Sequence, residues 1–227
     1  MARDGWLGTT ESGTSEVGRQ LQQLCVACVQ ATEVDGAGLA VFAGDGTPET
    51  VFATNAVAQR IEDLQFTTGE GPCMDAARSG APVLTPSVEL VSKGRWSGLA
   101  MELVEAGVGA IFAFPLRIGA VSLGTLDLHR HTPGELSDKQ LAMALQTVDH
   151  ASAVLLAVTA QALDSPPETT YRMVVHQAAG MAMVQLDTTI EEALLRMRAT
   201  AYAEAISINE LAADLVSRRR RLSKEEP

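Results

Sequence analysis

Apolar residues at helical spacing mark the C-terminal part of the chain, from position 173 to 216. Two stripes follow the i, i+3, i+4, i+7 pattern of amphipathic helices. They are Ile190, Ala193, Leu194, Met197 and Ala201, followed by Ile208, Leu211, Ala212, Leu215 and Val216. Thr188-x-x-Glu191 and Ser207-x-x-Glu210 match the capping box, in which a hydroxyl and a carboxylate satisfy backbone N–H groups. The pattern predicts three short helices, with Ser165-Pro166-Pro167-Glu168 before the first.

A single long helix is predicted over residues 136–163. Its apolar seam steps alternately by four and three residues, as in a coiled coil. The seam comprises Leu141, Leu145, Val148, Ser152, Leu155, Thr159 and Ala162. Ser137-x-x-Gln140 caps the start and Pro166-Pro167 prevents continuation. A helix about 40 Å long with an apolar strip is expected to pair with a second copy, so we predict a homodimer.

Short strands and helices alternate over the preceding residues. The first apolar helical face holds Val17, Leu21, Leu24, Cys25 and Cys28. Strands are predicted at 37–43, 50–54, 82–85, 110–116 and 121–129, with turns at Gly44-Asp45-Gly46 and Ile118-Gly119-Ala120. Further helices are predicted around Ile61 and Leu64, at 74–79 and at 96–106. This mixture indicates an α+β fold.

Composition places the chain among ordinary globular proteins. It has 227 residues, of which 46% are hydrophobic and 20% charged, and this suits one large or two small domains. Residues 1–16 lack the apolar stretch of a signal peptide, and no apolar run approaches the roughly 18–20 residues of a membrane span. Three cysteines without a secretion signal indicate reduced thiols. We therefore expect a cytoplasmic protein.

The charge is distributed unevenly along the chain. Of the formal net charge of −11, residues 1–167 carry −10, from nine Lys and Arg against nineteen Asp and Glu. Residues 168–227 carry −1, and they include four consecutive arginines at 218–221. Because neutralising phosphates supplies much of the affinity for nucleic acid, any such binding is expected to be confined to the C-terminal part.

Few residues suggest covalent or metal chemistry. Cys25 and Cys28 lie three apart on an apolar face without a second ligand pair, which favours buried small side chains over a metal site. His129-x-His131 alone offers too few ligands for a metal. No arrangement of nucleophile, acid and base stands out, so no catalytic residue and no enzyme activity are predicted.

The C-terminal helices carry a recognisable set of residues. Gln177-Ala178-x-Gly180-x-x-Met183, Glu192-Ala193-Leu194, Met197-Arg198, Ala201 and Leu211-Ala212 resemble the ANTAR family of RNA-binding antiterminators. Such modules often carry a lysine where this chain has Ala179. The resemblance implies binding to paired hairpin loops in nascent mRNA, which prevents a terminator hairpin from forming. The candidate RNA contacts are Gln177, Ala178, Gly180, Arg196, Arg198, Arg218 and Arg219.

The preceding part resembles a GAF domain, a small-molecule sensor with a central antiparallel sheet flanked by helices. The resemblance spans roughly residues 15–160. It rests on Thr68-Gly69-Glu70-Gly71-Pro72-Cys73, Arg95-Trp96, Gly107-Val108, Phe114-Pro115-Leu116 and Gly124-Thr125-Leu126. Candidate pocket residues are Cys73, Arg95, Trp96 and Phe114. Core packing explains Trp96 and Phe114 equally well, and a surface or helix-end charge explains Arg95 equally well. GAF domains that attach a bilin usually have histidine beside the cysteine. Met74 stands there, so a covalent chromophore is disfavoured and no cofactor is assigned.

These observations predict the following organisation. Residues 1–13 form a disordered start, 14–163 a GAF domain ending in a dimerisation helix at 137–163, 168–222 an ANTAR module, and 223–227 a tail. The function implied is a signal-responsive transcription antiterminator with an unidentified small-molecule signal. One alternative is a DNA-binding regulator, since three short helices also suit a helix-turn-helix, although Glu204 and Glu210 flank the third helix. Another is a ligand-binding dimerisation module without nucleic-acid activity.

Overall fold

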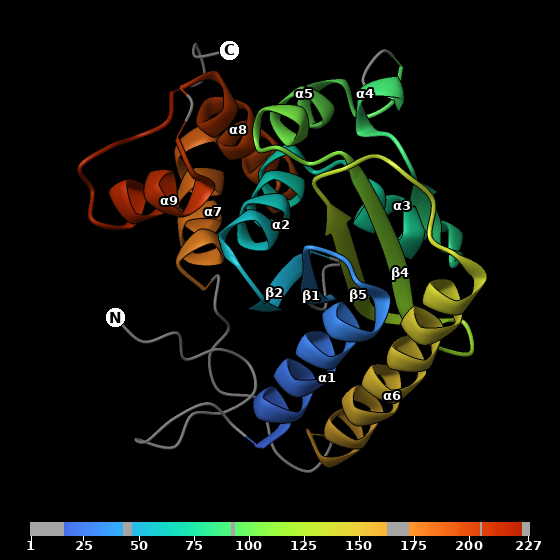
Figure 1. Ribbon diagram of the computed structural model, residues 1–227. Coiled ribbons are helices and arrows are strands. Elements are labelled where there is room, and N and C mark those ends of the chain that lie inside the picture. The colour runs from blue at the N-terminus through green and yellow to red at the C-terminus, as the bar shows by residue number, and fades with distance from the viewer. Residues whose placement is uncertain (1–15, 43–46, 92–93, 163–172, 205, 224–227) are drawn as a thin grey trace.

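A computed structural model describes residues 16–42, 47–91, 94–162, 173–204 and 206–223 (Figure 1). The predicted disordered start, the Gly44-Asp45-Gly46 turn and the cap at Ser165 to Glu168 lie outside these ranges, as does nearly all of the predicted tail. Residues 16–162 are called the sheet domain below, and residues 173–223 the three-helix unit.

The sheet domain is built on five antiparallel strands in the order β2-β1-β5-β4-β3. The strands are β1 (Gly36–Phe42), β2 (Pro48–Ala53), β3 (Val83–Thr85), β4 (Ala110–Ile118) and β5 (Val121–Arg130). All five lie where alternation predicted them, with β3 at one edge. Leu126 of β5 pairs with Leu39 of β1 on one side and with Phe114 of β4 on the other. These three apolar residues face the same core, so the register follows the buried pattern.

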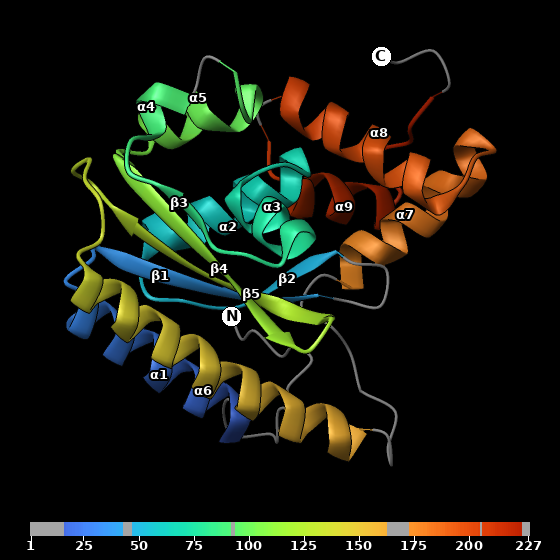
Figure 2. The same cartoon turned by 90° about the vertical axis from the view of Figure 1, so that its right-hand side faces the viewer.

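Helices cover both faces of the sheet (Figure 2). On one face lie α1 (Glu16–Thr32) and α6 (Asp138–Ala162), side by side. On the other lie α2 (Ala56–Thr68), α3 (Pro72–Ser79), α4 (Val88–Val91) and α5 (Ser97–Glu105). The α+β class is therefore confirmed. None of the described helices combines the length and apolar character that crossing a membrane requires.

The seam of α6 has a different partner from the one predicted. Val148 and Leu155 are only 8% and 2% exposed, because they pack in the core between α6, α1 and the sheet. Leu145 is 40% exposed and lies outside that core. The strip is thus largely covered by its own domain, so it does not by itself require a second copy. The predicted cap is confirmed, since Ser137 donates its N–H to Gln140 Oε1 at 2.9 Å.

The three predicted C-terminal helices are present as α7 (Met173–Leu186), α8 (Ile190–Ala203) and α9 (Ile208–Val216). They share a core that includes Val175, Ala182, Met197, Leu211 and Leu215. Ser207 caps α9 by accepting the N–H of Glu210 at 3.1 Å, as predicted. The cap of α8 is Thr189, not Thr188. Thr188 does not take the cap position because it belongs to the turn that ends α7, where its N–H donates to Met183 O.

Candidate ligand site and nucleic-acid interface

A polar interior lies between the sheet and helices α2 and α3. It contains Glu62 and Gln65 from α2, Cys73 from α3 and Asp127 from β5, all buried. Gln65 Nε2 donates to Asp127 Oδ2 at 2.5 Å. Gln65 Oε1 accepts the N–H of Cys73 at 2.8 Å. One amide side chain therefore joins two helices to the central strand.

Two glycines in β1 make room for this interior. A methyl group at Gly38 would overlap the Glu62 carboxylate, and one at Gly36 would overlap the imidazole of His129. Glycine in a strand interior is destabilising in itself, and it often marks a site where another group approaches closely. Because Gly36 and Gly38 have no side chains, His129 and Glu62 pack directly against the backbone of β1.

Some polar atoms of the interior lack a hydrogen-bond partner. Among the described residues, Asp127 Oδ1 and Thr125 Oγ1 are buried without a partner, although buried polar atoms are normally paired. Burial raises the pKa of Asp127 to about 7, against the opposing effect of the Gln65 hydrogen bond. Burial, together with the nearby His131, lowers the pKa of His129 to about 4. A bound molecule with hydrogen-bonding groups would satisfy these oxygens.

Arg95 and Trp96, two of the predicted pocket residues, meet on Asp75. Asp75 Oδ2 accepts from Arg95 Nη2 at 2.7 Å and from Trp96 Nε1 at 2.9 Å. The Arg95 guanidinium lies 4.4 Å from the centre of the Trp96 ring. Trp96 has a φ of 52°, which bulky residues rarely adopt and which costs free energy. This cluster ties α3 to the start of α5.

Phe114 and Cys73 do not join that cluster. Phe114 is fully buried in the core beneath α1 and α6, on the opposite face of the sheet from Trp96. Because neighbouring residues of a strand alternate between faces, Phe114 points away from the polar interior and from Trp96. Cys73 belongs to the first turn of α3 and not to a loop, and burial raises the pKa of its thiol. A thiol held protonated in this way is a poor nucleophile for attaching a chromophore.

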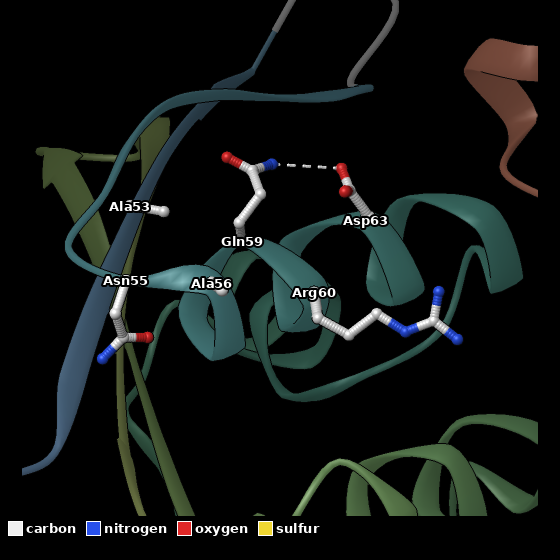
Figure 3. Close-up of a pocket in the computed structure, with 6 residues that line it drawn as sticks. All are labelled: Ala53, Asn55, Ala56, Gln59, Arg60 and Asp63. Atoms are coloured by element: carbon white, nitrogen blue, oxygen red, sulfur yellow. Dashed lines mark hydrogen bonds between the residues drawn. The ribbon is translucent and has the colours of Figure 1, made fainter.

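A polar groove of about 430 Å³ opens beside the N-terminus of α2 (Figure 3). It is lined by Ala53, Asn55, Ala56, Gln59, Arg60 and Asp63. Gln59 donates to Asp63 at 3.2 Å, and Arg60 pairs with Glu102 at 3.0 Å. Asn55 caps α2 by accepting the N–H of Ala58. Its polar groups already have partners, so the groove points to no particular ligand.

The cysteines and histidines lack the geometry of a metal site. Cys25 and Cys28 are buried in the core beneath α1, as predicted. The rings of His129 and His131 lie 5.8 Å apart in an edge-to-face arrangement. Within the part of the chain that the structure describes, no three His, Cys, Asp or Glu side chains converge on a point where a metal ion could bind.

The predicted RNA contacts of α7 fall into two environments. Gln177 is exposed, and Gly180 is half-buried with open space where a side chain would project. Ala178 is completely buried in the core of the three-helix unit, as is Ala179. Ala178 therefore packs in the core of the three-helix unit in this arrangement, where it is not accessible for a direct RNA contact. The open space at Gly180 also excludes close helix packing as the reason for a glycine there.

The predicted arginines are similarly divided. Arg196 is half-buried and pairs with Glu192 at 3.4 Å along α8. Arg198 turns to another side of α8, with its guanidinium 5.6 Å from the ring of Phe66 in the sheet domain. Arg218 is exposed, whereas Arg219 pairs with Asp214 at 2.6 Å. The arginine run lies beyond the end of α9, and the chain there is held by the buried Leu222.

A groove of about 260 Å³ separates α8 from the sheet domain. It is lined by Thr67, Thr68, Gly98, Leu195, Arg198, Ala199 and Tyr202. Phe66 extends past this groove and is buried within the core of the three-helix unit. No local pattern in the sequence distinguishes Phe66 from an ordinary core residue of α2.

Comparison with known proteins agrees with this architecture. The family model described as a GAF domain matches residues 16–155. A comparison with curated proteins gives no match. A domain of a two-component sensor histidine kinase protein from Sinorhizobium meliloti 1021 is 17% identical, with a TM-score of 0.55 over 67% of this chain and 99% of that one.

Two further solved structures show the same likeness. A GAF domain/HD domain protein from Geobacter sulfurreducens is 15% identical, with a TM-score of 0.53 over 65% of this chain and 97% of that one. The GAF domain of an Acinetobacter phosphoenolpyruvate-protein phosphotransferase is 11% identical, with a TM-score of 0.51 over 65% and 87%. At these identities the likeness concerns the fold alone.

Proposed function

The chain belongs to the GAF domain family, and on that premise we propose that it is a signal-responsive, RNA-binding transcription antiterminator. The sheet domain acts as the sensor, and the three-helix unit acts as an ANTAR module. The module binds paired hairpin loops in a nascent mRNA and so prevents a terminator hairpin from forming. Binding alone accounts for this activity, so the proposal assigns no catalytic residue.

The observation that carries this proposal is the way the ANTAR-like residues divide between core and surface. The small and apolar members, among them Ala178, Ala193, Met197 and Ala212, are buried together. Gln177 lies at the surface of the same unit. A motif whose apolar positions build the core while its polar positions lie outside it is consistent with a folded recognition module. Sequence-specific RNA readers usually target unpaired loop bases, whose edges are open to such side chains.

The sensor ligand is proposed to be a small molecule bound in the polar interior. Asp127 Oδ1 and Thr125 Oγ1 lack partners there among the described residues, so the ligand supplies polar groups that form hydrogen bonds with them. The interior lies against α2, which also contacts the three-helix unit. A ligand in the polar interior would therefore lie against α2, the helix that contacts the RNA-binding module.

We also propose that the protein acts as a homodimer, which would present two modules to two loops. The support is the outer surface of the α1–α6 layer, since it exposes three large apolar side chains. Val26, Leu145 and Leu156 are 39%, 40% and 46% exposed. A second copy packing on this surface would remove them from water.

A gel-shift experiment tests the RNA-binding proposal. The full chain is titrated into an RNA with two hairpin loops, an RNA of equal length with one hairpin, and a duplex DNA of equal charge. Preferential binding to the two-hairpin RNA is expected. Preference for the duplex would replace the proposal with a DNA-binding regulator. If the chain binds no nucleic acid, with or without extracts of small molecules, the RNA-binding proposal is rejected in favour of a ligand-binding dimerisation module.

A further inference from the structure

The sheet domain presents a surface that fits the three-helix unit. This docking surface consists of Phe66, Thr67, Thr68 and Gly69 at the end of α2, together with Gly98 in α5. Phe66 is 1% exposed and packs among the core residues of the three-helix unit, although it belongs to a helix of the other domain. Figure 1 shows α2 lying beside the three-helix unit, and among the helices of that unit α2 contacts α8. The two parts of the chain therefore share one apolar contact.

The side of α8 that meets the docking surface carries Arg198. Its guanidinium lies over the ring of Phe66, and its Nη1 would be 3.2 Å from a methyl group at Gly69. Gly69 has a φ of 68° and ends α2, so no side chain lies between the two. The Nε atom of Arg198 is shielded from solvent. In this arrangement the edge of Arg198 that carries Nε is turned away from solvent, and Phe66 covers a face of the guanidinium, so only part of the group can reach a base.

Tyr202, one turn further along α8, repeats this arrangement. Its hydroxyl oxygen lies 3.6 Å from the place of a methyl group at Gly98, and its ring lines the groove between the domains. Leu195 and Ala199 line the same groove. The contact therefore runs along about two turns of α8, and Arg198 lies in the middle.

We propose that RNA and the docking surface compete for this side of α8, so that the sheet domain holds the module in a state that binds RNA weakly. The inference rests on the proposed function. Helix α2 supplies both Phe66, in the contact, and its neighbour Gln65, which bridges Asp127 in the polar interior. A signal releases the module only if it binds the undocked state more tightly than the docked one.

The test uses the full chain and measures affinity for the two-hairpin RNA. Phe66→Ala removes the apolar anchor, and Gly98→Leu places a bulky side chain against Tyr202. Both variants are expected to bind RNA roughly 5- to 150-fold more tightly than wild type, the usual range of coupling between two sites. Gly98→Ala is the matched control, because a methyl group there meets its neighbours at 3.5 Å or more, an ordinary contact. Its RNA affinity should equal that of wild type.

Hydrogen exchange of α8 in the RNA-free variants reports docking independently of RNA, and circular dichroism reports folding. Faster exchange in Gly98→Leu together with tighter RNA binding supports competition, even where Phe66→Ala fails to fold. Equal RNA affinity of wild type and Gly98→Leu, despite faster exchange, overturns competition while leaving RNA binding in place. Absence of RNA binding in wild type and in every variant overturns both proposals.

Discussion

Asp127 and His129 lie two residues apart on β5, and they should affect stability in opposite directions as the pH changes. The pKa of Asp127 is raised from 3.8 to about 7, so the folded protein keeps a proton that the unfolded chain releases. Its contribution to stability is full below about pH 4 and is lost as the pH rises through 7. The pKa of His129 is lowered from 6.5 to about 4. Its contribution is full above about pH 6.5 and is lost as the pH falls through 4.

Each pKa unit corresponds to about 1.4 kcal/mol. The Asp127 contribution therefore falls by about 4 kcal/mol between pH 4 and pH 7, while the His129 contribution rises by about 3 kcal/mol. In the wild type the two contributions oppose each other, so only their difference is seen. Replacing either residue should uncover the contribution of the other.

The assay is urea unfolding followed by tryptophan fluorescence at pH 4.5, 5.5, 6.5 and 7.5, with Trp96 reporting on the sheet domain. Asp127→Asn keeps an oxygen for Gln65 to bond and should become more stable, relative to wild type, as the pH rises. His129→Gln should become less stable over the same range. Because each variant is compared with wild type at the same pH, contributions from other titrating groups cancel. Parallel stability curves for the two variants would refute this reasoning.

Three further predictions concern the helices. Gly180→Ala should stabilise the three-helix unit by about 0.5–1 kcal/mol in thermal melts, because the site has room for a methyl group and glycine is unfavourable within a helix; a destabilised variant would contradict this. In the Gly98→Leu background, where docking is already disrupted, Arg198→Ala should weaken RNA binding by about 1–3 kcal/mol in titrations with helicity unchanged, whereas Arg196→Ala, on another side of α8, should lose less. Leu155→Asp should unfold the sheet domain, since it buries a charge, but Leu145→Asp should keep the helicity seen by circular dichroism and only separate a dimer in light scattering. An intact Leu155→Asp monomer would show that the seam faces a second chain after all.

Local patterns predicted most of the secondary structure because each depends on residues close in sequence. The alternation of Leu126 and Leu128 with Thr125 and Asp127 identifies β5 and separates its two faces. Alternation cannot say which face meets a ligand site and which a core. Phe114 was assigned to a pocket for this reason, although it belongs with Leu126 beneath α1 and α6.

The sequence-based predictions failed where a residue could contact either of two partners and the sequence did not distinguish them. The seam of α6 is apolar whether it meets another chain or its own sheet, and Val148 alone cannot distinguish these. Thr188 and Thr189 both offer a capping hydroxyl, and the turn closing α7 decides between them. Phe66 could not have been assigned to the three-helix unit, because its contact joins segments far apart in the chain. The interior site did leave one signal in the sequence, the alternating glycines Gly36 and Gly38.

Those glycines have a consequence for how the family can vary. Neither lies in a turn, and a side chain at either place would occupy space now taken by Glu62 or His129. Substitutions at Gly36 and Gly38 are therefore expected to be coupled to substitutions at His129 and Glu62. Among related sequences, replacement of Gly38 should occur together with a shorter residue at the position of Glu62. Relatives that keep the glycines should also keep the buried side chains that pack against them.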